Sequence, residues 1–243
     1  AGVARVILDS VDSTMSEAAR RAAQVTTPTW IMAQSQTAAR GRRGRAWMTP
    51  AGNLNATLVF KPQASPSEAA QRSFVAANAL FQALSIYVPV EALALKWPND
   101  VLLNGGKLAG ILLESSSSGA GVAHLAIGTG VNLIAAPDAS VVEEGALQPV
   151  SLLGETGLRV DPETFLTHLA AAYAQWENSF TAQGFAPLRA AWLSHAARLG
   201  QPIRARTGTT THHGLFQTID ATGALILETD HGAIAIPAAE VFF

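Results

Sequence analysis

The stretch LALKWPNDVLLNGGKLAGILLESSSSGAGVAHLAIGTGV, residues 93–131, decides the fold. It consists of short apolar runs separated by turn residues, which is typical of consecutive strands. The turns are Asn-Gly-Gly at 104–106 and a Ser/Gly stretch at 115–121, which favours a hairpin connection. The pattern predicts four strands, near 93–97, 101–103, 108–114 and 122–131.

The flanking sequence adds both strands and helices. Further strands are predicted near 3–8, 30–34 and 55–60. Thr14-x-x-Glu17 fits a capping box, and Pro162 suits a first helical turn. The segment 36–47 has no apolar period and is expected to be an exposed loop. Apolar spacing and these start signals predict helices over 14–23, 67–87, 162–182 and 186–197.

The sequence changes character at Gly200. Short alternating runs follow, and Thr222-Gly223 and Asp230-His231-Gly232 mark turns between them. This pattern predicts a small β-barrel of about five short strands. We therefore expect one mixed α/β domain over 1–198 and a small all-β domain over 199–243. The predicted short strands are at 203–206, 214–219, 224–227 and 233–236.

Composition restricts the function classes. The chain has 243 residues, of which 49% are hydrophobic and 14% charged, as expected for a compact globular protein. The net charge of −2 gives no general attraction to nucleic acid, so any anion site must be local. The sequence has no cysteine, which excludes disulfides, thiolate catalysis and cysteine-bound metal. It has no apolar run of ~20 residues and no signal-peptide pattern, so a cytoplasmic location is expected.

The loop at 36–47 is rich in arginine. Its like charges repel one another, so we expect the free loop to be mobile and an anion to order it. Guanidinium groups bind phosphate through paired hydrogen bonds, and glycine lets the backbone approach a phosphate closely. Trp47 offers a flat face for a base. A solvated basic loop or an RNA-binding patch is the alternative. The loop contains Arg40, Gly41, Arg42, Arg43, Gly44 and Arg45.

Two other segments carry polar groups at strand ends. In KWPND at 96–100, Pro98 fixes the backbone so that Asn99 and Asp100 project from a rigid corner. An ordinary β-turn is the alternative there. In KLAGILLE at 107–114, Lys107 begins an otherwise apolar strand, a position that suits a carboxylate or phosphate partner.

Familiar nucleotide motifs fail in this region. Leu108 follows Gly-Gly-Lys at 105–107 where a P-loop needs Ser or Thr. The segment GTGVNL at 128–133 lacks the third glycine of a dinucleotide fingerprint. No residue set predicts a metal site directly.

Five motifs, taken in order, resemble the biotin–protein ligase family. The resemblance spans most of the chain, and five motifs at compatible intervals are far more specific than any one of them. It implies an α+β fold: a mixed-sheet catalytic domain of the biotin/lipoate ligase type, similar to class II aminoacyl-tRNA synthetases, followed by an SH3-like β-barrel. The motifs are DST at 12–14, QTAARGRRGRAW at 36–47, KWPND at 96–100, KLAGIL at 107–112 and GTGVN at 128–132.

The resemblance also implies roles for individual residues. Lys107 and Arg42 match catalytic positions. Mg²⁺ is implied near Asn99 and Asn132. The positions that match biotin-binding residues of the family are Ser13, Thr14, Gln36, Arg40, Gly41, Arg42, Lys107, Gly110, Gly128 and Gly130. Those that match ATP-binding residues are Arg43, Arg45, Trp47, Asn99, Asp100 and Asn132.

The implied reaction is ATP-dependent activation of biotin to biotinyl-5′-AMP and transfer of biotin to a lysine of a biotin carboxyl carrier protein. A homodimer is compatible with the resemblance. Because the first strand is predicted to begin near residue 3, no helix-turn-helix precedes it, and we expect no sequence-specific DNA binding. Two positions depart from the family pattern: Ala39 stands where Gly is usual, and Met15 where Asn is usual.

Two rival functions remain open at this stage. A ligase for lipoate or octanoate would share the broad fold, although it is not expected to carry RGRRGR followed by KWPND. A nucleic-acid-binding module that uses the arginine loop would show salt-sensitive affinity without biotin.

Overall fold

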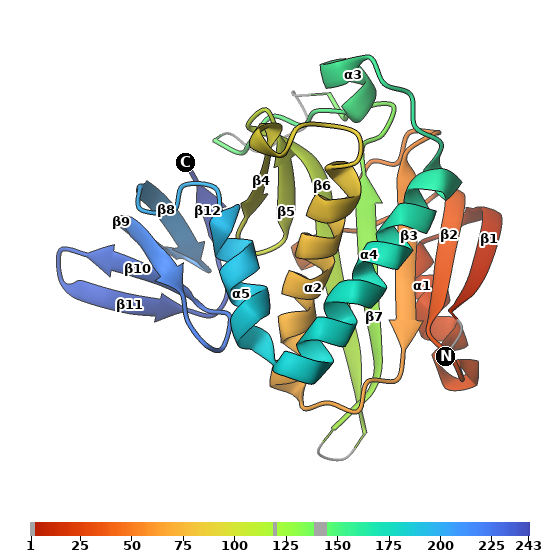
Figure 1. The fold of residues 1–243 in the computed structure, drawn as a ribbon, viewed down its shortest axis with the longest axis horizontal. Helices are drawn as coiled ribbons and strands as arrows, with labels where there is room; N and C mark the ends of the chain where they lie inside the picture. Colours follow the sequence, from red (N-terminus) through yellow and green to blue (C-terminus); the bar gives the residue numbers. More distant parts are fainter. Residues whose placement is uncertain (1–2, 119–120, 139–144) are drawn as a thin grey trace.

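The computed structural model describes residues 3–118, 121–138 and 145–243, which form two sheets and a layer of helices (Figure 1). The larger sheet has seven strands in the order β1-β2-β3-β7-β6-β5-β4. Only β1 and β2 pair in parallel, and every other pair is antiparallel, so the predicted mixed sheet is confirmed. Its strands are β1 (Ala4–Val11), β2 (Thr29–Gln36), β3 (Leu54–Phe60), β4 (Leu93–Lys96), β5 (Asp100–Leu103), β6 (Gly106–Ser118) and β7 (Gly121–Val131).

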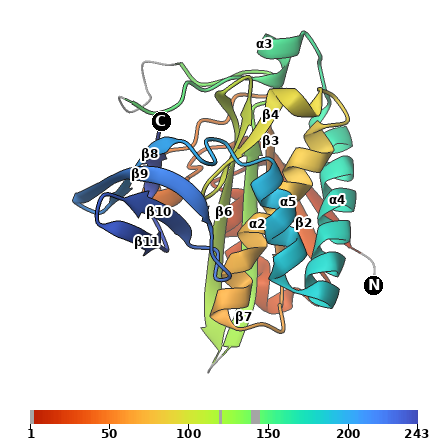
Figure 2. The same ribbon diagram turned by 60° about the vertical axis from the view of Figure 1, so that its left-hand side comes forward.

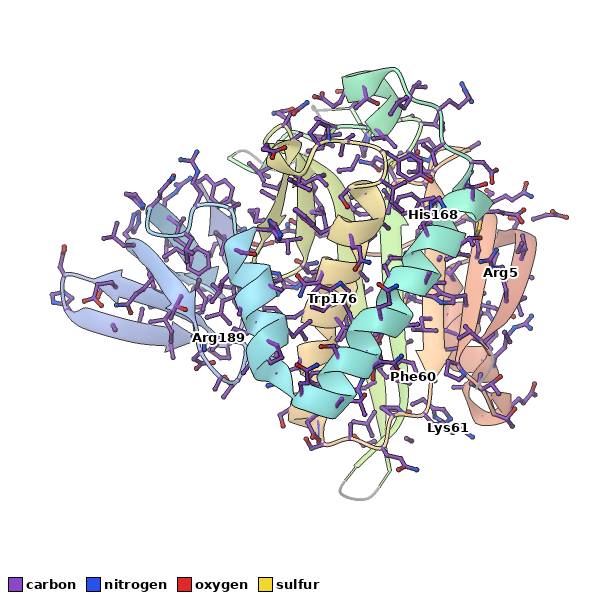
Figure 3. All side chains as sticks on the ribbon, in the orientation of Figure 1. Arg5, Phe60, Lys61, His168, Trp176 and Arg189 are labelled. Atoms are coloured by element: carbon purple, nitrogen blue, oxygen red, sulfur yellow. The ribbon has the colours of Figure 1, made fainter. Side chains whose placement is uncertain are left out.

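Three helices cover one face of this sheet (Figure 1): α2 (Pro66–Leu84), α4 (Pro162–Gln183) and α5 (Phe185–Ser194). Helix α2 begins with a capping box in which Ser65 and Glu68 satisfy each other's backbone N–H groups. Phe60, at the end of β3, lies under this helical layer (Figure 3). Most of the buried apolar side chains pack between these helices and the sheet.

On the opposite face, the described residues form a single short helix, α1 (Thr14–Arg21). Successive strand residues point to opposite faces, so Ile31 and Val59 pack with α1 residue Ala18. The capping box predicted for this helix is wrong. Ser13 is the N-cap, and the Glu17 carboxylate instead pairs with Arg20 and Arg21. Much of this face is therefore uncovered by helices and available for a site.

The smaller sheet lies beside α5 (Figure 2) and contains β8 (Pro202–Thr207), β9 (Thr210–Ile219), β10 (Leu225–Thr229), β11 (Gly232–Ile236) and β12 (Glu240–Phe242). Its order is β11-β10-β9-β8-β12, and all of its pairings are antiparallel. Arg189 of α5 donates to the Ile219 carbonyl (Figure 3), and Trp97 Nε1 donates to the Gly223 carbonyl at 3.1 Å. These bonds connect the smaller sheet to the larger unit.

The predicted helices and strands are all present, with ends shifted by a few residues. The middle of the predicted hairpin connection, 119–120, lies outside the described residues. Short elements that were not predicted are α3 (Leu152–Thr156), β12 and the 3₁₀ turns Ala22–Gln24, Arg42–Gly44 and Val90–Ala92. Among the described helices, none combines the length and apolarity that a membrane span requires.

Candidate active site

A recessed floor, with glycines at its centre, crosses the face of the larger sheet that lies opposite helices α2, α4 and α5. Asp100, Gly110, Gly130 and Asn55 stand opposite one another on β5, β6, β7 and β3. The two central positions are glycines, so the surface between Asp100 and Asn55 is recessed. In the next row of the same face, Gly128 lies opposite Thr57. The floor is held by the strand pairing of the sheet.

Side chains lie so close to this floor that a methyl group on any of its three glycines would require a neighbouring side chain to shift. A Cβ added to Gly130 would fall 2.5 Å from Trp47 Nε1, and one added to Gly128 would fall 2.8 Å from Met15 Sδ. At Gly110 the nearest Trp47 atom is 3.2 Å away. Glycine is therefore required by the close approach of Trp47 and Met15.

A pocket of about 700 Å³ lies above the floor. The structure brings together every site residue named from the sequence, although these residues come from distant segments. They are Ser13, Thr14, Gln36, Arg40, Gly41, Arg42, Arg43, Arg45, Trp47, Asn99, Asp100, Lys107, Gly110, Gly128, Gly130 and Asn132.

The pocket is strongly basic in a chain whose net charge is −2. Of the described residues, six basic and two acidic side chains line it. Lys107 Nζ lies 2.8 Å from Asp100 Oδ1, and Lys96 Nζ lies 3.9 Å from Asp100 Oδ2. Burial lowers the pKa of Lys96, which is only 9% exposed. One carboxylate thus faces two amines, an arrangement that leaves positive charge for an anionic ligand.

The arginine loop is held by carboxylates from distant parts of the chain. Arg43 Nη1 lies 2.9 Å from Glu240 Oε2, and Arg45 also pairs with Glu240, which belongs to β12 of the smaller sheet. Arg40 pairs with Glu114 at 3.0 Å. These ion pairs offset the repulsion expected between the arginines.

Arg42 reaches deeper than its neighbours. Its Nη1 donates to Asn99 Oδ1 at 3.3 Å and to the Ala239 carbonyl at 3.4 Å. Burial lowers its pKa. Asn99 is itself fixed, because its Nδ2 donates to the Ile111 carbonyl at 2.7 Å. The guanidinium of Arg42 is therefore positioned inside the pocket.

The other end of the pocket is polar but uncharged. Gln36 Oε1 accepts from Thr14 N at 2.8 Å and from Thr14 Oγ1 at 3.2 Å. Thr57 Oγ1 donates to Thr14 Oγ1 at 2.8 Å, and the Ser13 hydroxyl accepts from Met15 N at 3.2 Å. This connected set can both donate to and accept from a small polar ring.

Among the described charged and amide side chains of the pocket, three were missed from the sequence: Asn55, Lys96 and Glu240. Lys96 lies in KWPND, so its presence beside Asp100 could have been suspected. Asn55 and Glu240 carry no local signal, because only tertiary structure brings them to the pocket. Among the described residues, no group of three His, Cys, Asp or Glu side chains is placed to hold a metal. Asn132 Oδ1 is a buried oxygen with no hydrogen-bond partner in the described part of the chain.

The fold and the pocket define a class: an α+β protein with a basic pocket on a mixed sheet, beside a small antiparallel sheet. Residues 7–132 match the Biotin/lipoate A/B protein ligase family, and residues 199–243 match the Biotin protein ligase C terminal domain. The chain therefore belongs to the biotin protein ligases of this family.

Similar proteins support this placement over the whole chain. A biotin–[acetyl-CoA-carboxylase] ligase of Paracoccus denitrificans is 58% identical, covering 98% of this chain and 99% of the relative. The bifunctional ligase/repressor BirA of Bacillus subtilis is 31% identical over 97% of this chain and 71% of its own length. The biotin protein ligase of Aquifex aeolicus, solved in complex with biotin and ATP, has the same fold, with a TM-score of 0.80 at 24% identity over 98% and 97% of the two chains.

Proposed function

We propose that this chain activates biotin with ATP to form biotinyl-5′-AMP and then transfers biotin to a lysine of a biotin carboxyl carrier domain. The observation that carries the proposal is the convergence of Lys107 and the arginine loop on one pocket above the glycine floor. A carboxylate and a nucleotide could meet there with their charges offset. The named function of the Paracoccus relative supports the same reaction.

The first step joins two anions. A biotin carboxylate oxygen attacks the α-phosphorus of ATP, a new P–O bond forms, and pyrophosphate leaves. Lys107 would hold the carboxylate, exchanging part of its contact with Asp100 for the ligand. Arg42 would stabilise the negative charge that develops on the phosphate, because its guanidinium is already positioned inside the pocket. Fixed cations of this kind stabilise the transition state without having to reorganise.

The uncharged end suits the ureido ring of biotin. The Ser13 hydroxyl accepts a bond from Met15 N and still has its own proton to donate to the ureido oxygen. The Gln36 side chain keeps its amide N–H₂ for the ligand while its oxygen is held by Thr14. Arg40 and Gly41 of the arginine loop would cover the ring. Gly128 lets the Met15 side chain pack closely against the floor beside the ring.

The nucleotide would occupy the side of the pocket lined by the arginine loop. Arg43 and Arg45 would leave Glu240 for the phosphates, and the indole of Trp47 would face the adenine. For the Mg²⁺ that accompanies ATP, buried oxygens fit the role: Asp100 carries a carboxylate, and Asn132 Oδ1 lacks a partner among the described residues. Bound Mg²⁺ would neutralise phosphate charge, and Asn99 beside Asp100 would help to orient it.

In the second step the acceptor lysine amine attacks the carbonyl carbon of the mixed anhydride. The C–N bond forms, AMP leaves, and the amine loses a proton. The role of this chain is to hold the anhydride and exclude water until the carrier arrives. An arginine loop closed by phosphate contacts would provide that cover.

Several finer expectations stay predictions: a boundary between two domains at 198/199, a homodimer, a cytoplasmic location and the absence of sequence-specific DNA binding. Oligomeric state can be measured by sedimentation with and without ligands. A fluorescence titration with random duplex DNA at two salt concentrations would test the nucleic-acid rival.

Incubation with biotin and ATP followed by mass spectrometry tests the proposed activation step. Biotinyl-AMP and pyrophosphate are the expected products. Competition between biotin and lipoate in an ATP–pyrophosphate exchange assay separates the two ligands of this broad family. Exchange that depends on lipoate and ignores biotin would overturn the proposal.

A further inference from the structure

Asn55 is a buried amide whose side chain has no hydrogen-bond partner among the described residues. It is 2% exposed, and neither its Nδ2 nor its Oδ1 has a hydrogen-bond partner in the described part of the chain. A side-chain amide offers two donors and an acceptor oxygen, and leaving them buried and unpaired is unfavourable. Asn55 lines the pocket. A ligand in the pocket can supply the missing partner.

Asn53 shows what a structural asparagine looks like in the same segment. It is also buried, at 3% exposed. Its Nδ2 donates to the Ala135 carbonyl at 2.7 Å, and its Oδ1 accepts from Ile134 N at 2.9 Å and Ala135 N at 3.1 Å. Asn53 therefore ties two segments together. Asn55, two residues further, makes no such bonds within the described part of the chain.

The position of Asn55 indicates which end of the ligand it meets. Thr57 lies on the same strand face and belongs to the uncharged end through its bond to Thr14. Two residues of an extended strand separate Asn55 from Thr57 by about 7 Å. Through the pairing of β3, β7, β6 and β5, Asn55 lies in line with Asp100 at the other side of the floor. The Asp100 carboxylate forms an ion pair with the Lys107 amine. Asn55 thus faces the side where the carboxyl group must lie.

We propose that Asn55 binds the carboxyl end of biotin, donating from Nδ2 to a carboxylate oxygen and, after activation, to the carbonyl oxygen of biotinyl-AMP. This inference rests on the proposed function. Lys107 supplies the charge from the opposite side of the floor, whereas the neutral amide keeps a useful bond when the carboxylate becomes an uncharged carbonyl. The same N–H is placed to stabilise the negative charge that develops on that oxygen when the acceptor amine attacks.

Asn55→Leu tests the contact, because leucine has a similar volume and no polar atoms. Biotin affinity, measured by calorimetry without ATP, should fall about 10- to 100-fold, the usual effect of losing a hydrogen bond to a charged group. The Tm should hold or rise, because an unpaired buried amide is removed. Asn53→Leu is the matched control and should lower the Tm through loss of its three bonds.

A biotin analogue with a methyl group in place of the carboxyl identifies the partner atom. The wild-type chain and Asn55→Leu should bind this analogue equally well. Unchanged biotin affinity in a folded Asn55→Leu chain would overturn the inference, and an equal loss for biotin and the analogue would overturn the assignment to the carboxyl end. A lowered Tm with unchanged affinity would assign Asn55 a structural role instead. The proposed function fails separately, if the wild-type chain forms no biotinyl-AMP.

Discussion

The glycine floor and the arginine loop form two sides of one pocket but are held in different ways. The floor at Gly110 and Gly130 belongs to a continuous ladder of strands, so its shape is set by backbone hydrogen bonds. The arginine loop at 39–47 is held mainly by side-chain ion pairs to Glu240 and Glu114. Exposed ion pairs of this kind are individually weak.

Because the two sides are held differently, we expect them to respond differently to ligands. A floor that exists before binding favours a small uncharged ring and alkyl chain without large rearrangement. A loop whose arginines are paired with carboxylates can exchange those partners for phosphates at little net change in charge pairing. On this account the biotin side is preformed and the nucleotide side is remodelled by binding.

Lys107→Ala should have the largest effect. It removes the amine that faces both reacting anions, so we expect biotinyl-AMP formation to fall by roughly 10²- to 10³-fold. Pyrophosphate exchange measures the loss. Lys61→Ala is the control, because Lys61 is an exposed lysine outside the pocket. Near-normal exchange by a folded Lys107→Ala chain would remove the role assigned to this amine.

Gly130→Ala tests whether the floor is preformed. Its added Cβ would meet Trp47 at 2.5 Å, whereas the Cβ of Gly110→Ala would meet the same ring at 3.2 Å. We expect biotin affinity to fall about tenfold or more in Gly130→Ala, with a smaller loss in Gly110→Ala, because the extra methyl must displace the Trp47 indole that packs on the floor. Calorimetry gives both values. Equal wild-type affinity in the two variants would mean that biotin binding does not depend on the packing of Trp47 against this floor.

Glu240→Gln tests the loop. It removes the charge that holds Arg43 and Arg45, so the ligand-free loop should be cleaved several-fold faster by trypsin, in line with the loss of weak ion pairs. Glu228→Gln, on β10 of the same small sheet, is the matched control. A cleavage rate that is the same in both variants would show that Glu240 does not hold the loop.

Acid should also weaken the ion pairs that hold the arginine loop, because Glu240 becomes protonated at low pH. Burial alone raises the pKa of Glu240, but the hydrogen bond from Arg206 and the charges of Arg45 and Arg43 outweigh it and leave the pKa below its ordinary value. A carboxyl whose pKa is lowered on folding keeps its stabilising effect above the unfolded value, about 4.3, and loses it as the pH falls further. The protection factors of the loop amides, which correct for the intrinsic pH dependence of exchange, should therefore be constant from pH 7 to 5 and fall below about pH 4 towards those of Glu240→Gln. A fall in protection already between pH 7 and 5 would contradict this account.

The elements and most of the pocket could be predicted from the sequence because their signals are local. Apolar alternation marked the strands that carry Gly110 and Gly130, and the arginine motif marked the loop. Helix α1 shows the limit: Thr14-x-x-Glu17 fitted a capping box, but Ser13 caps the helix, and Glu17 pairs with two arginines. A local motif does not show which of several possible hydrogen-bond or ion-pair partners a side chain takes in the folded chain.

The remaining features depend on long-range contacts. Glu240 reaches the arginine loop only because the smaller sheet docks beside α5, and nothing near position 240 indicates this. Asn55 looked like an ordinary strand residue until its neighbours were placed. The expectation that a free arginine loop is mobile stays a prediction. Such motion would require the ion pairs to Glu240 and Glu114 to break.

Hydrogen–deuterium exchange with and without biotin and ATP tests most directly whether the biotin side is preformed and the nucleotide side is remodelled by binding. Peptides that cover 39–47 should become strongly protected when both ligands are present, whereas those that cover 106–118 and 121–131 should be slow to exchange in every state. Biotin alone should bind and protect the loop only partly, near Arg40 and Gly41. A loop that is as protected without ligands as with them, or strands that become protected only on binding, would contradict the account.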